Sequence, residues 1–132
     1  MSGGIFMENE KSASKNPIKI KSFDFAVRIV KFTKWLSSEK VNYSLIDQVL
    51  RSGTSIGANV AEAVVAQTRK DFVHKMHIAF KEANETIYWL ELLKEAEIIS
   101  QKAANELLDD ANELRKILAS IIKTTKQNSQ EK

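Results

Sequence analysis

The sequence predicts an all-α protein, an up-down-up-down antiparallel four-helix bundle, from three observations. Its 132 residues contain one proline and four glycines, whereas a sandwich or barrel needs a turn signal about every 8–12 residues. Apolar residues recur at steps of three and four along four segments, which is the period of an amphipathic helix. The connectors between these segments are short, so consecutive helices should run antiparallel. We expect one domain, with the bundle over residues 21–126.

The first helix is expected to begin at Ser22, whose hydroxyl can cap it. Residues 1–20 are polar, aperiodic and contain the only proline, so we expect a disordered or loosely docked arm there. The helix carries two adjacent apolar rows, one with Phe25, Ile29, Phe32 and Leu36 and the other with Phe23, Val27 and Val30. It is therefore apolar over more than half its circumference, which is more than one packing seam requires.

Three further helices are expected, over residues 44–66, 69–97 and 100–125. Thr68 can cap the third helix, with Asp71 three residues later completing a pair that resembles a capping box. Ser100 can cap the fourth helix, whose apolar stripe alternates steps of four and three like a heptad seam. The polar residues 127–132 are expected to form a frayed tail.

The second helix contains an unusual segment with two glycines near its middle, Gly53 and Gly57. Each glycine inside a helix costs about 1 kcal/mol relative to alanine, so a compensating interaction is required. Because the two glycines are four residues apart, they lie on one face and remove two side chains from it. This spacing predicts close approach of a neighbouring helix.

A polar stripe runs beside this face, formed by Ser52, Ser55, Asn59 and Glu62 after Arg51. Such side chains are costly to bury without partners, so they should be exposed or hydrogen-bonded. One interpretation is a fixed polar contact to another helix or subunit. The alternatives are a site for a ligand or nucleic acid and a catalytic site.

Large aromatic side chains and a basic cluster supply the remaining candidates. Four helices that each bury one apolar seam do not need the additional apolar surface of Trp35, Tyr88 and Trp89. These side chains therefore either mark an interface or cap the ends of the bundle. The basic cluster on the first helix consists of Arg28, Lys31 and Lys34. These cations either bind an anion such as RNA or simply solvate the helix surface.

Several classes of chemistry are disfavoured by what the sequence lacks. Without cysteine there is no disulfide, thiolate zinc site or cysteine nucleophile, and a reducing cytoplasm is the expected location. A di-iron bundle needs Glu-x-x-His motifs, which are absent, and His74 and His77 lack the further ligands that zinc requires. No apolar run approaches the roughly 18 residues of a membrane span. We expect no enzyme activity, metal, cofactor, membrane partner or small-molecule substrate.

The run Arg51-Ser52-Gly53-Thr54-Ser55-Ile56-Gly57-Ala58-Asn59-Val60-Ala61-Glu62 resembles the signature of a bacterial four-helix-bundle family. That family is related to proteins encoded in intervening sequences of the 23S ribosomal RNA gene. Further matches are Phe23-Asp24, Asp71-Phe72 and the run Lys-Glu-Ala-Asn-Glu-Thr-Ile-Tyr-Trp-Leu at 81–90, so that the resemblance covers about residues 20–122. Ala63 departs from the glycine that many relatives have there, which questions a tight bend at this position.

The resemblance implies a left-handed bundle that assembles as a ring of identical subunits, often a pentamer. Most of the family has no established biochemical activity. Similar accessory variability proteins of diversity-generating retroelements are basic and bind RNA. Two functional hypotheses follow. The first is a non-enzymatic self-assembling protein whose ring is the functional unit. The alternative is an RNA-binding accessory protein that uses the basic surface of the first helix.

Overall fold

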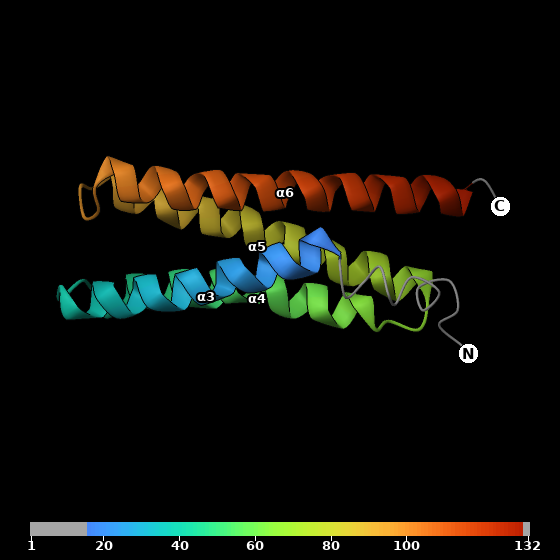
Figure 1. Ribbon diagram of the computed structural model, residues 1–132, viewed down its shortest axis with the longest axis horizontal. Coiled ribbons are helices and arrows are strands. Elements are labelled where there is room, and N and C mark those ends of the chain that lie inside the picture. The colour runs from blue at the N-terminus through green and yellow to red at the C-terminus, as the bar shows by residue number, and fades with distance from the viewer. Residues whose placement is uncertain (1–15, 131–132) are drawn as a thin grey trace.

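The computed structural model describes residues 16–130, which form an all-α bundle of four helices without any strand in that range. In chain order the helices are α3 (Pro17–Ser38), α4 (Tyr43–Val64), α5 (Arg69–Glu95) and α6 (Gln101–Gln130). Figure 1 shows that each helix runs back along the one before it, in the predicted up-down-up-down order. The predicted fold class is confirmed, while the left-handed twist stays a prediction.

Helix α3 begins at Pro17 rather than at Ser22. The side chain of Asn16 accepts a hydrogen bond of 2.9 Å from the backbone N–H of Ile18 and caps the helix. Proline suits the first turn because its fixed φ is helical and its missing N–H would have no partner there. Ser22 is instead buried within the helix. Of the arm expected over residues 1–20, residues 1–15 lie outside the described part, and the rest is this cap and first turn.

Helix α6 also extends past its expected end, as far as Gln130. Residues 101–130 contain no glycine or proline that would end a helix. The tail expected over 127–132 is therefore helical through Gln130, and residues 131–132 lie outside the described part.

The predicted caps of α5 and α6 are present. The Thr68 hydroxyl accepts from the N–H of Asp71 at 3.0 Å, and the Ser100 hydroxyl accepts from the N–H of Ala103 at 3.1 Å. The connectors after α3 and α5 turn at Lys40 and Glu97, each with φ of 60°. In both, the backbone bonds of a Schellman motif satisfy the last carbonyls, such as Val41 N–H to Leu36 at 3.2 Å and Ile98 N–H to Leu93 at 3.0 Å.

The core consists of apolar residues from all four helices. Its largest fully buried side chains include Ile29, Leu36, Ile56, Met76, Leu90, Leu114 and Leu118. Four polar side chains are also buried, and each bonds a carbonyl of its own helix: Ser22, Thr33, Ser52 and Thr86. Among the described residues no buried side-chain polar atom lacks a partner.

The two glycines of α4 allow α3 to approach closely, as their spacing predicts. A Cβ built on Gly57 would lie 3.0 Å from the backbone oxygen of Ser22. A Cβ built on Gly53 would lie 2.8 Å from Cγ1 and 2.9 Å from Cγ2 of Ile29. The loss of helix propensity at both positions is thus offset by tight packing of α3 on α4.

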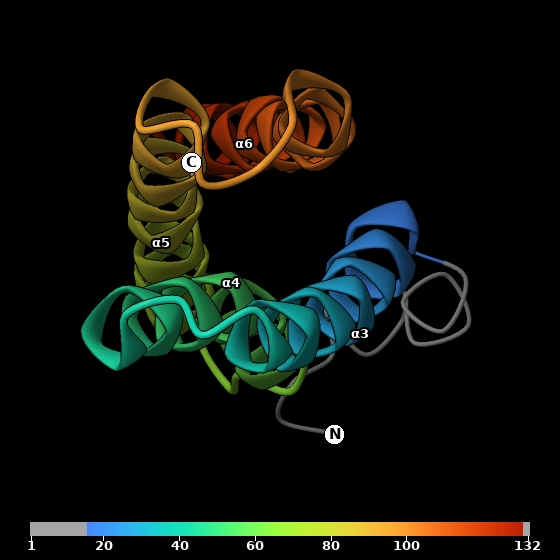
Figure 2. The same cartoon turned by 90° about the vertical axis from the view of Figure 1, so that its left-hand side faces the viewer.

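The circle of helices is incompletely closed. Consecutive helices pack closely, whereas α3 and α6 pack much less closely. Viewed from one end in Figure 2, the helices follow an open C-shaped path from α3 through α4 and α5 to α6, with a gap between its two ends. The flanks of α3 therefore have different surroundings, one facing α6 and the other lying next to α4.

Candidate functional site

The polar stripe of α4 is satisfied largely within its own helix. The Ser52 hydroxyl donates to the carbonyl of Gln48 at 2.8 Å, and the Ser55 hydroxyl donates to that of Arg51 at 2.6 Å. The side-chain amide of Asn59 donates to the Ser55 carbonyl at 2.8 Å. Serine and asparagine side chains commonly bond the backbone one turn back in this way, and these three are not bonded to one another's side chains. The stripe therefore lacks the nucleophile, base and orienting acid of a hydrolytic site.

The charged ends of the stripe connect α4 to α5. Arg51 forms ion pairs with Glu82, at 3.2 Å, and with Glu85. Glu85 also accepts from the indole N–H of Trp89 at 3.0 Å, so Arg51, Glu85 and Trp89 form one connected group. At the other end, Lys75 pairs with Glu62 at 2.7 Å. Arg51 and Glu62 therefore both contact another helix, α5, as the interpretation of a fixed polar contact expects.

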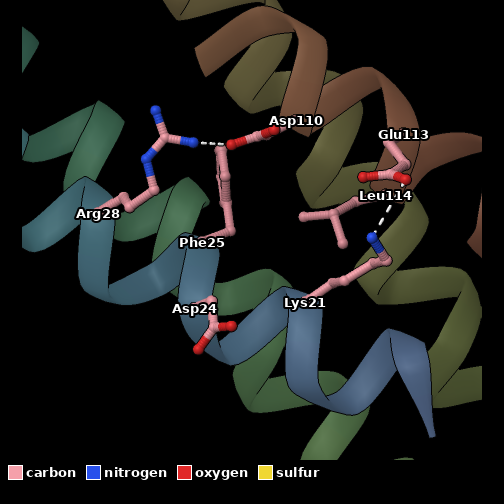
Figure 3. Close-up of a pocket in the computed structure, with 7 residues that line it drawn as sticks. All are labelled: Lys21, Asp24, Phe25, Arg28, Asp110, Glu113 and Leu114. Carbon is pink, nitrogen blue, oxygen red and sulfur yellow. Dashed lines mark hydrogen bonds and ion pairs between the residues drawn. The ribbon is translucent and has the colours of Figure 1, made fainter. Parts of the chain in front are cut away.

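The basic cluster of α3 is divided by the packing. Arg28 forms an ion pair with Asp110 of α6, and about two helical turns earlier Lys21 pairs with Glu113 at 3.2 Å. Both pairs lie at the pocket of Figure 3, between α3 and α6, which is lined by Lys21, Asp24, Phe25, Arg28, Asp110, Glu113 and Leu114. Because both cations of this pocket are already paired with carboxylates and Asp24 adds a third carboxylate to its lining, it is unsuited to an anionic ligand. Lys31 and Lys34 are exposed on α3.

The candidate aromatic residues separate into two places. Trp35 stacks on Phe32, with ring centroids 6.2 Å apart, and is 46% exposed near the C-terminal end of α3. Tyr88 and Trp89 meet edge to face on α5, with centroids 5.0 Å apart. Tyr88 is 58% exposed, and Leu92, one turn further along, is exposed as well. Leu92 is not among the predicted candidates, although its position four residues after Tyr88 places it on the same face of α5.

The second apolar row of α3 is the most extended exposed apolar feature of the described chain. We call Ile20, Phe23, Val27 and Val30 the α3 row, and all four are exposed, Phe23 to 67%. The row lies on the flank next to α4, where a groove is lined by Lys19, Ile20, Phe23, Asp24, Gly57 and Ala61. Between Arg51 and Glu62 the neighbouring face of α4 carries no charge. Ile20 is absent from the row expected from the sequence, because residues 1–20 are predicted to form an arm outside the helix. The spacing of three residues between Ile20 and Phe23 is the signal that could have added it.

Residues 16–130 contain no group of three or more histidine, cysteine, aspartate or glutamate side chains placed to hold a metal. His74 and His77 are exposed on α5, and His77 stacks on Phe80. Within the same range, no helix combines the length and the apolar character that crossing a membrane requires.

Comparison with known proteins agrees with this geometry. Residues 14–120 match the model of a family described as 23S rRNA-intervening sequence protein. The chain is also similar to a crystal structure of a protein of unknown function from the S23 ribosomal protein family of Bacteroides thetaiotaomicron, with 52% identity and a TM-score of 0.78. That match covers 80% of this chain and 98% of the other. No curated protein matches the sequence.

Proposed function

Since the chain belongs to the 23S rRNA-intervening sequence protein family, we propose that it is a non-enzymatic cytoplasmic protein that works by assembling with copies of itself. The assembly is a closed ring, and the resemblance of the α4 signature favours five subunits. The absence of cysteine is consistent with a reducing compartment. The internal hydrogen bonds of Ser52, Ser55 and Asn59 leave no activated nucleophile in the signature segment.

The observation that carries this proposal is the exposure of the α3 row. Ile20, Phe23, Val27 and Val30 lie about one turn apart and extend over about 15 Å of helix, at 1.5 Å per residue. Completing the burial of such half-exposed side chains contributes about 1 kcal/mol each. The uncharged face of α4 beside the row suits the dehydrated centre of an interface, because charged residues are depleted there.

The competing proposal is RNA binding by Arg28, Lys31 and Lys34. It draws support from the net charge of α3, which has five basic residues and one acidic residue. It is weakened at Arg28, whose guanidinium is paired with Asp110. Phosphate would have to displace that carboxylate before binding. Self-assembly is therefore the function we favour.

The test measures the mass of the particle by light scattering at micromolar concentration. We expect the wild-type protein to give a sharp multiple of the 14.9 kDa subunit mass. Phe23→Asp should give a folded monomer, because it places a charge in the α3 row without disturbing the core. Tyr43→Asp is the matched control, since Tyr43 is 78% exposed but lies at the first position of α4, away from the row. This control should assemble normally.

A monomeric wild-type protein would refute the proposal. If that monomer binds RNA with an affinity that falls steeply as salt rises, and Lys31→Glu with Lys34→Glu abolishes the binding, RNA recognition takes its place. An oligomer that persists in Phe23→Asp would show that assembly uses a different surface.

A further inference from the structure

We infer that the α3 row of one subunit docks on the C-terminal half of α5 of the next subunit, around Tyr88 and Leu92, so that the contact joins two unlike surfaces. This inference rests on the proposed self-assembly and names the surface on the second copy that receives the row. It follows from the position, the rigidity and the charge of the two surfaces.

The receiving surface is an exposed apolar patch that is held in place. We call Tyr88, Trp89 and Leu92 the α5 patch, in which Tyr88 is 58% and Leu92 38% exposed. Trp89 supports the Tyr88 ring edge to face, and its own indole is fixed by Glu85. Glu85 is in turn paired with Arg51 of α4. A patch ordered before binding loses little side-chain entropy on association, which favours its use as an interface.

The row and the patch are on different helices of the subunit, α3 and α5. In Figure 2, α4 lies between α3 and α5. Both α3 and α5 pack more closely on α4 than on any other helix. The row occupies the flank of α3 next to α4, as the shared groove with Gly57 and Ala61 indicates. A subunit that carries two different adhesive surfaces joins its copies head to tail, and such contacts form a ring when the rotation from one subunit to the next closes the circle.

Charge favours contact between unlike surfaces over contact between two α3 rows. Outside its two ion pairs with α6, helix α3 carries Lys19, Lys31 and Lys34 against Asp24. Outside the pair of Glu85 with Arg51, the C-terminal half of α5 carries Glu91 and Glu95 against Lys94. Two α3 helices brought together would repel, whereas α3 against the C-terminal half of α5 pairs opposite charges. This complementarity identifies a second copy of the chain as the occupant of each surface.

The shapes are also compatible. The groove beside the α3 row is bounded on the α4 side by Gly57 and Ala61, which project little or no side chain. Its other wall is formed by the apolar Ile20 and Phe23 together with the charged Lys19 and Asp24. Such a groove accommodates a flat aromatic ring, and Tyr88 is the most exposed aromatic residue of α5 among the described residues.

The first experiment measures the oligomeric mass of Tyr88→Asp. We expect this variant to be a folded monomer, because Tyr88 is exposed and the charge enters the patch. His77→Asp is the matched control, since His77 is exposed on the same face of α5 about three turns earlier, at 3.6 residues per turn. The control should assemble like the wild type. A Tyr88→Asp protein that keeps the full wild-type mass would overturn the inference.

A second experiment tests the unlike contact directly and exploits the absence of natural cysteines. The double variant Phe23→Cys with Tyr88→Cys is treated with a short bismaleimide and analysed on a denaturing gel. We expect a ladder that ends at the ring size, with only monomer from either single variant. Cross-linked dimers from Phe23→Cys alone would overturn the inference in favour of a symmetric α3 contact.

These outcomes separate the inference from the proposal on which it depends. A monomeric wild type refutes self-assembly itself. A wild-type oligomer that is lost in Phe23→Asp but retained in Tyr88→Asp leaves self-assembly standing and refutes the role of the α5 patch. If both variants are monomeric and only the double cysteine variant forms a ladder, the head-to-tail contact is established.

Discussion

The substitution Gly53→Ala in the middle of α4 has two opposing effects on stability, a gain in helix propensity and a loss from overpacking. Replacing glycine by alanine in a helix interior gains about 1 kcal/mol. The added Cβ would, however, lie 2.8 and 2.9 Å from the two γ-carbons of Ile29. Carbon atoms normally pack at about 3.5–4.0 Å, and overpacking of a core costs about 1–3 kcal/mol. Ile29 is fully buried and β-branched, so it has little freedom to rotate away. We expect Gly53→Ala to lower the free energy of unfolding by about 1 kcal/mol as the balance of these two effects.

A double-mutant cycle with Ile29 isolates this contact. Ile29→Ala alone should cost about 2–5 kcal/mol, because it leaves a cavity in the core. It also removes both γ-carbons, so Gly53→Ala in that background should gain about 1 kcal/mol instead of losing it. The two substitutions are therefore coupled by about 2 kcal/mol. Ile29→Val is the control, because valine keeps both γ-carbons and Gly53→Ala should remain as costly as in the wild type.

The assay is urea unfolding followed by far-UV circular dichroism, with all variants at one protein concentration. The concentration must be constant because assembly makes the apparent stability depend on it. Two results would refute the reasoning. One is a Gly53→Ala variant that is more stable than the wild type, which would mean that helix propensity decides. The other is an equal effect of Gly53→Ala in the wild-type, Ile29→Val and Ile29→Ala backgrounds, which would mean that no close contact exists.

Three further predictions concern the ends and the surface of the helices. Glu97→Gly and Lys40→Gly should each raise the free energy of unfolding by about 1 kcal/mol, because both native residues adopt the left-handed φ of 60°; a fall in melting temperature would contradict this. Thr68→Ala should lower it by about 1 kcal/mol through loss of the α5 cap, whereas the neighbouring Gln67→Ala should leave urea unfolding unchanged. Arg51→Gln should cost less than about 1 kcal/mol, because its side chain is 44% exposed, and this loss should vanish in high salt. A loss that is independent of salt would assign Arg51 a packing role instead.

The helices could be predicted because their signals are local. Apolar residues at steps of three and four, together with hydroxyl caps such as Thr68 and Ser100, act within one or two turns. The predicted start of α3 at Ser22 is wrong, because that prediction interprets Pro17 as a sign of disorder although the helix begins there. The pair Asn16-Pro17 is itself a start signal, since asparagine caps a helix and proline suits its first position.

The candidate sites were only partly predictable. The spacing of Gly53 and Gly57 predicted the close approach of a helix, and the second row of α3 predicted excess apolar surface. The pairing of Arg28 with Asp110 could not be foreseen, because it joins α3 and α6, which pack much less closely than consecutive helices and are far apart in the chain. The connection of Arg51 to Trp89 through Glu85 could not be foreseen either, because it depends on how α5 is rotated relative to α4.

By itself the sequence determined the four helices, their order and the faces that they bury, since hydrophobic periodicity and capping depend on neighbouring residues. Only the tertiary structure decided which of these faces remain open. It neutralised part of the basic helix against α6, left the α3 row uncovered beside α4 and held the exposed Tyr88 against Trp89 on α5. The physical reason is that exposure and charge pairing depend on how helices rotate and pack against one another, which no single segment of the chain encodes.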